Sequence, residues 1–253
     1  MSPILVGLIA LLCSYASALA GMALHSRLPA QHKDDESKDV IKLVMGLIAT
    51  IAALVLSLLI ATAHTSYDRQ ESEVQELGLH IVQLDRILVQ YGPETAEARS
   101  LLRQIVATDV ELVWPSTGRP KVNLRASTNH EKGEKLAQLI AGLAPTTDVQ
   151  RFVKSRALQL VTNLSDTRGL LTEQAGGSLA WPFFAVLIFW LVVLFLGFGF
   201  LTRPNATVLV ALFVGALSVG GAIFLILDMN QPYSGLMQIS PLPIRSALTA
   251  ISQ

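Results

Sequence analysis

The segment Ile41–Ala63 reads IKLVMGLIATIAALVLSLLIATA. Beyond Lys42 it carries no charge, and about 20 apolar residues at about 1.5 Å rise each span the roughly 30 Å core of a bilayer. Three further runs have the same character: Pro3–Leu24, Trp181–Leu201 and Ala206–Leu227. A soluble chain of 253 residues has no interior that could hide four such segments. The sequence therefore predicts an all-α, polytopic membrane protein with four transmembrane helices in the lipid bilayer.

The predicted spans divide the chain into four parts. Residues 1–63 hold the first two spans with the polar loop 25–40, and residues 181–228 hold the third and fourth. Residues 64–180 are predicted to form an extramembrane helical bundle inserted between helices 2 and 3. Residues 229–253 contain several prolines and a glycine, which predict a bent interfacial tail.

The helical domain shows its packing seam in its spacing. Val74, Leu77, Ile81, Leu84 and Leu88 recur three and four residues apart, as in a packed helix. No strong breaker interrupts the chain before Gly92-Pro93. We therefore predict one helix over Ile41–Tyr91. Two later amphipathic stretches follow, and Thr147 or Asp148 is expected to cap the second of them.

Three of the spans carry small residues at helical spacing, and the stripe of the second span holds Gly46, Thr50, Ala53, Ser57 and Ala61. The stripe of the first span holds Gly7, Ala10, Ser14, Ser17 and Gly21, and that of the fourth holds Ala211, Gly215, Ser218 and Ala222. In lipid, helices associate where small residues let their backbones approach. The second stripe is therefore a candidate pore lining or subunit interface of a homo-oligomer. The alternative is packing against the first span of the same chain.

The end of the fourth span offers a second group of candidates. Asp228 ends the apolar run, and Pro232 and Gly235 bend the chain just after it. These three residues are candidates for the vestibule of a pore. Alternatively, Asp228 only ends the helix at the interface.

Several functions are disfavoured by what the sequence lacks. Residues 64–180 hold 13 Lys and Arg against 14 Asp and Glu, interspersed, which argues against a nucleic-acid partner. No ionisable residue lies deep in a span, where active transporters usually carry one. No nucleophile elbow, zinc-protease motif or phosphate loop occurs, so we expect neither an enzyme nor a cofactor. The first loop holds His25, His32 and several carboxylates, but their spacing fits no defined site, and we expect no metal.

Four stretches carry a resemblance to a known family: HSRLPAQHKDDESKDV (His25–Val40), LDRILVQYGPETAEAR (Leu84–Arg99), WPFFAVLIFWLVVLFLGFG (Trp181–Gly199) and AIFLILDMNQPYSGLMQIS (Ala222–Ser240). Through them the chain resembles the bestrophin-like family of bacterial integral membrane proteins of unestablished function. The resemblance implies an oligomeric, channel-like protein in the bacterial inner (plasma) membrane. Bestrophins themselves are pentameric anion channels, but no bestrophin pore or calcium motif is matched, so no pore residue is carried over.

The residues and the resemblance together lead to two functional hypotheses. The first is a homo-oligomeric ion channel that conducts an inorganic ion, an anion by the analogy with bestrophins. The alternative is a non-conducting membrane protein whose helical domain binds a partner or senses the state of the envelope. The short loops hold Arg27, Lys33, Lys38 and Arg203, so the positive-inside rule places those loops in the cytoplasm and the helical domain on the extracytoplasmic side.

Overall fold

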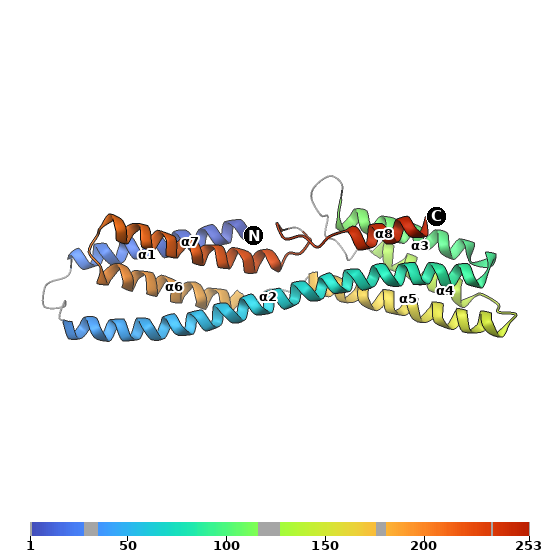
Figure 1. Ribbon diagram of the computed structural model, residues 1–253, viewed down its shortest axis with the longest axis horizontal. Coiled ribbons are helices and arrows are strands. Elements are labelled where there is room, and N and C mark those ends of the chain that lie inside the picture. Colours follow the sequence, from blue (N-terminus) through green and yellow to red (C-terminus); the bar gives the residue numbers. More distant parts are fainter. Residues whose placement is uncertain (1, 28–34, 116–126, 176–180, 234, 253) are drawn as a thin grey trace. The chain divides into compact units, whose positions relative to one another are not determined.

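The computed structural model describes residues 2–27, 35–115, 127–175, 181–233 and 235–252, and these residues form helices and turns without a β-strand. The helices are α1 (Pro3–Arg27), α2 (Asp35–Tyr91), a short 3-10 helix η2 (Pro93–Thr95), α3 (Ala96–Val113), α4 (Ser127–Ala141), α5 (Asp148–Ala175), α6 (Trp181–Leu201), α7 (Ala206–Met229) and α8 (Leu242–Ile251) (Figure 1). Of these, α1, α2, α6 and α7 are long and apolar enough to cross a membrane. The all-α class and the four apolar helices are thus as predicted.

The chain forms two compact units. The membrane unit comprises Met1–Ser66 and Ser178–Asn230, and the bundle unit comprises Tyr67–Gly177 and Gln231–Gln253. The predicted long helix is confirmed, because α2 continues without a break from Asp35 to Tyr91. Its first half belongs to the membrane unit and its second half to the bundle unit.

Within the membrane unit, α1 packs against α6 and α7, and glycines let the helix backbones come close together (Figure 1). A Cβ on Gly21 would collide with the carbonyl oxygen of Leu196, and one on Gly199 would collide with that of Ala18. Gly7 and Gly220 approach each other in the same way, because a Cβ on either would lie 2.9 Å from the carbonyl oxygen of the other. Such close approach is what holds helices together in lipid.

The bundle unit buries one continuous apolar core. From α2 it takes Val74, Ile81, Leu84 and Leu88, with Leu77 packed at its edge, so the predicted seam is confirmed. Helices α3, α4 and α5 contribute further side chains: Leu102, Ile105, Leu136, Ile140, Leu160 and Val161.

The ends of the bundle helices are fixed by specific polar contacts. At the predicted end of α2, Gly92 has a φ of 136°, a conformation that favours glycine. The hydroxyl of Thr95 then donates to the Leu88 carbonyl at 2.6 Å, which satisfies a helix-end acceptor. The expected cap of α5 is Thr147, whose Oγ1 accepts from the backbone N–H of Gln150 at 3.1 Å.

The chain after α7 differs from the division drawn on the sequence. Residues Gln231–Gln253 group with the bundle unit, and they contribute Tyr233, Ile239, Ile244, Ala247 and Ile251 to its core. The physical reason is the spacing of the last three residues, which gives α8 an apolar face. Gly78 of α2 accommodates this helix, because a Cβ there would lie 3.0 Å from the carbonyl oxygen of Pro243.

Candidate pore-lining and subunit-interface face

The small-residue stripe of α1 is buried by contacts within the same chain. Its five members, Gly7, Ala10, Ser14, Ser17 and Gly21, are all buried. Ser17 directs its hydroxyl to the Ser14 carbonyl at 2.7 Å, so it brings no unmet polar group to the contact. Packing within one subunit therefore accounts for this stripe in full.

The small-residue stripe of α2 has the opposite environment. All five members, Gly46, Thr50, Ala53, Ser57 and Ala61, are exposed in the single chain. A Cβ added to Gly46 would meet no atom within 4 Å. In this structure the stripe therefore does not contact α1, which was the alternative drawn from the sequence.

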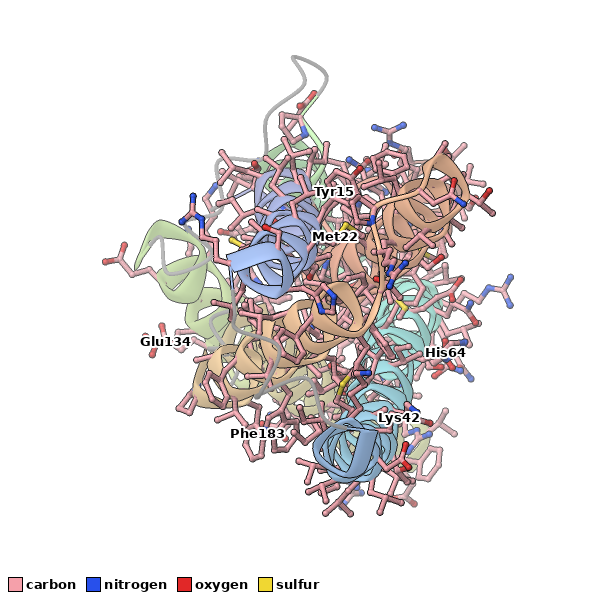
Figure 2. The ribbon with its side chains drawn as sticks, turned by 90° about the vertical axis from the view of Figure 1, so that its left-hand side faces the viewer. Tyr15, Met22, Lys42, His64, Glu134 and Phe183 are labelled. Carbon is pink, nitrogen blue, oxygen red and sulfur yellow. The ribbon has the colours of Figure 1, made fainter. Side chains whose placement is uncertain are left out.

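A different face of α2 makes the contacts within the membrane unit. Met45, Ala52 and Ala63 are buried, and the side chain of Met45 fills the space beside Gly197 of α6. At about 100° per residue, these positions lie roughly 120° around the helix from the centre of the stripe. Viewed along the helices in Figure 2, α6 lies between the start of α2 at Lys42 and α1, which carries Tyr15 and Met22.

Among the four apolar helices, α2 is the least covered by its own chain. Only 11% of its most apolar window is buried, against 39% for α1, 33% for α6 and 22% for α7. The rest of its exposed surface is aliphatic and suited to lipid, with Leu47, Leu54 and Leu58 more than 60% exposed. The stripe is thus a narrow row of small side chains beside a face of large ones.

One hydroxyl of the α2 stripe already makes a hydrogen bond within its own helix. Thr50 donates to the Gly46 carbonyl at 2.9 Å, a bond within its own helix. A threonine in this state can face lipid, a neighbouring helix or water, because its hydroxyl proton already has an acceptor. Its oxygen can still accept a hydrogen bond from a neighbour.

The stripe of α7 is intermediate between the other two. Ala211 and Ser218 are exposed, and Gly215 and Ala222 are half-buried. The helix packs instead through its buried Ala216, Gly220 and Ile223.

The three vestibule candidates lie at the end of α7 and in the following turn. Asp228 is 2% exposed, Pro232 is buried and Gly235 is half-buried. In the single chain the side chains of Asp228 and Pro232 are therefore shielded from solvent, and Gly235 is partly covered. The single cysteine, Cys13, is exposed on α1.

No group of three or more His, Cys, Asp or Glu side chains that could hold a metal ion occurs among the described residues. His32 and Asp34 of the first loop fall outside them. His25 lies at the end of α1 with its ring edge against Phe200, at 5.7 Å between ring centroids.

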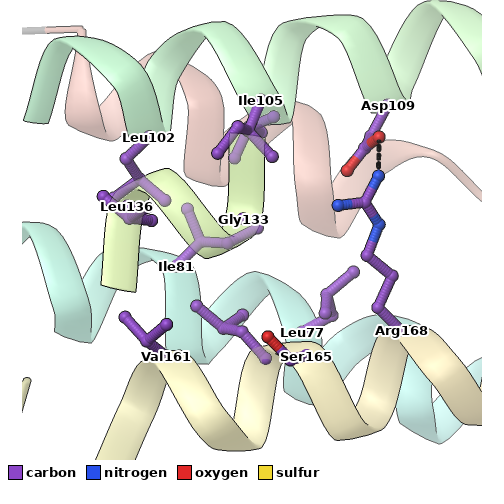
Figure 3. Close-up of a pocket in the computed structure, with 12 residues that line it drawn as sticks. Leu77, Ile81, Leu102, Ile105, Asp109, Gly133, Leu136, Val161, Ser165 and Arg168 are labelled. Carbon is purple, nitrogen blue, oxygen red and sulfur yellow. Dashed lines mark hydrogen bonds and ion pairs between the residues drawn. The ribbon is translucent and has the colours of Figure 1, made fainter. Parts of the chain in front are cut away.

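The bundle unit contains a cavity of about 60 Å³ that the sequence did not indicate. Apolar side chains of α2, α3, α4 and α5 line it, and Arg168 and Asp109 pair at one end through a 2.5 Å contact (Figure 3). Gly133 also lines it and has open space where a side chain would stand. The cavity has room for a few waters and is smaller than cavities known to take an aromatic ligand.

Two buried polar features hold the bundle around its core. Arg99 of α3 pairs with the buried Asp85 of α2 through two contacts of 2.7 and 3.0 Å, and the hydrogen bond raises the Arg99 pKa. Tyr233 is buried edge-on against Trp114, and burial, with a smaller contribution from Glu73, raises the pKa of its phenol. Neither contact is predictable from spacing, because each joins residues distant in the chain.

Comparison with known proteins places these features in a family. The family model described as "Bestrophin-like domain" matches residues 12–244, nearly the whole chain. No curated protein and no solved structure matches it. The matched range includes α2, with its exposed stripe, and the turn after α7. The chain therefore belongs to the bestrophin-like family of membrane proteins.

Proposed function

We propose that this protein is a homo-oligomeric ion channel in which the α2 stripe faces a neighbouring subunit or the pore axis. The observation that carries the proposal is the contrast between the stripes: that of α1 is buried in the chain and that of α2 is exposed. A row of small residues facing lipid forgoes the close packing that stabilises helices in a membrane. A second copy of the chain supplies that packing, and the family membership supports a channel-like role.

A pore built around this face would be lined by small apolar groups and hydroxyls. Gly46, Ala53 and Ala61 leave room near the axis, and Thr50 and Ser57 offer oxygen atoms to a passing ion. Such a lining lacks fixed charge, so it would conduct passively and could gate by dewetting of its narrow part. Asp228, Pro232 and Gly235 would then shape the mouth, with the buried Asp228 holding the end of α7.

The test uses two enlarging substitutions on neighbouring faces of α2. Ala53→Leu adds three heavy atoms to the stripe, whereas Leu54→Phe enlarges a side chain on the lipid-suited face. We expect Ala53→Leu to change the oligomer mass in detergent or the ion flux into liposomes, and Leu54→Phe to leave both as in the parent. Parental mass and flux in both Ala53→Leu and Ser57→Leu would remove α2 from the pore axis and from the interface.

The parent protein decides between the two functional classes. A channel should release a trapped halide from liposomes, and the reversal potential in a salt gradient shows whether anions carry the current. A monomer that conducts nothing would instead support the non-conducting protein that binds a partner or senses the envelope.

We also propose a bacterial inner-membrane location with the bundle unit on the extracytoplasmic side. A reporter fused to the C-terminus that is active only in the cytoplasm would overturn this topology.

A further inference from the structure

The turn after α7 forms a closed loop with a fixed base. The N–H of Ile239 donates to the Pro232 carbonyl at 2.9 Å, and Trp114 Nε1 donates to the Ile239 carbonyl at 3.0 Å. Tyr233 and Ile239 are both buried in the bundle core, so they anchor the two ends of the loop. Leu236, Met237 and Gln238 lie between these anchors and are exposed.

Between these anchors the loop presents apolar side chains to its surroundings. Leu236 is 77% exposed, the most of the large apolar residues of the described chain, and Met237 is 42% exposed. We call these two residues the apolar tip. Residues 229–244 contain no charged side chain, so no charge near the tip in the chain opposes its transfer out of water.

The chain keeps the apolar tip close to the end of a membrane span. Met229 is the last residue of α7, and Leu236 follows it by seven residues. Seven extended residues reach at most about 25 Å, and the hydrogen-bonded turns of this loop shorten that reach. The interfacial layer that flanks the hydrocarbon core begins at the end of such a span.

We propose that the apolar tip enters the lipid at the bilayer interface beside the end of α7. Leucine and methionine gain free energy when their apolar surface leaves water, and an interface accepts them beside polar groups such as the exposed Gln238. The buried anchors Tyr233 and Ile239 then attach the bundle unit to the membrane surface. This attachment does not depend on whether the protein conducts ions.

The test places one nitroxide label at a time on a Cys13→Ala background, because Cys13 is the single cysteine. Labels at Leu236→Cys, at Leu54→Cys on the apolar run of α2, and at exposed Glu134→Cys are compared in the full-length protein in phosphatidylcholine liposomes. Collision rates with oxygen, which concentrates in lipid, and with a water-soluble nickel complex are measured at each site. Leu236 is a surface position, so its substitution leaves the bundle core intact.

We expect the Leu236 label to fall between the Leu54 and Glu134 labels, with more oxygen collisions and fewer nickel collisions than the Glu134 label. A nickel collision rate equal to that of the Glu134 label would place the tip in water and overturn the proposal. Spectral broadening that disappears on mixing with unlabelled chain would show that a second copy covers the tip, and would overturn it as well.

Discussion

The packing of residues 231–253 against the rest of the bundle unit should depend on Ile239. This side chain is 1% exposed, and its carbonyl oxygen accepts from Trp114 Nε1. Ile239→Ala removes three buried heavy atoms and keeps the backbone contact. Deletions of this kind cost about 2–5 kcal/mol. If this loss of stability acts on local unfolding of residues 231–253, a loss of about 2 kcal/mol raises the locally unfolded population about 30-fold.

Trypsin gives a direct assay of this opening. Arg245 is the only Lys or Arg in residues 231–253 and lies in the first turns of α8. Cleavage there requires the helix to unfold locally, so its rate follows the open population when closing is fast. We expect Ile239→Ala to lose the peptide Ser246–Gln253 about 30-fold faster than the parent.

A matched control separates core packing from a general effect on the segment. Leu242 is 67% exposed, so Leu242→Ala removes a similar volume without opening a cavity and should leave the cleavage rate within about twofold of the parent. Equal rates for Ile239→Ala and the parent would refute the reasoning, because burial of Ile239 would then contribute nothing to docking.

Three further substitutions test contacts described above. Arg99→Met should lower the free energy of unfolding of the bundle by about 3 kcal/mol in a denaturant titration, because it leaves the buried Asp85 carboxylate without its ion pair. Tyr233 has a raised pKa in the folded protein, so its phenol loses the proton at lower pH in the unfolded chain. The stability of the bundle should therefore fall as the pH rises above about 10. Tyr233→Phe should weaken that fall, measured by thermal melts across pH 9–12. Gly21→Val should reduce the yield of monodisperse protein, since its side chain meets the α6 backbone, whereas Gly221→Val, with open space at its Cβ, should not.

The helices themselves could be predicted from local pattern. Apolar length identified the four candidate spans, and the spacing from Val74 to Leu88 identified the seam of α2 before any contact was known. Gly92-Pro93 fixed the end of that helix, because glycine supplies the positive φ and proline starts the next turn.

The partners of these surfaces could not be predicted, because they depend on residues far apart in the chain. Three stripes with similar spacing have three different environments, and only the contacts of α1 with α6 and α7 explain why. The spacing around Gly78 does not show that the backbone of Pro243 lies against it. The apolar face of Ile244, Ala247 and Ile251 was the one local signal that the tail packs on a core.

The cavity beside Gly133 gives the bundle unit a mechanical property as well as a packing defect. The cavity is partly open to solvent, and any part of it that water leaves empty is lost on unfolding, so hydrostatic pressure favours the unfolded state in proportion to that part. Such unfolding volumes are on the order of tens of mL/mol. A side chain at Gly133 that fills the void should make the bundle less compressible and raise the pressure needed to unfold it. Gly133 is therefore a position at which a side chain can change how the bundle unit responds to pressure.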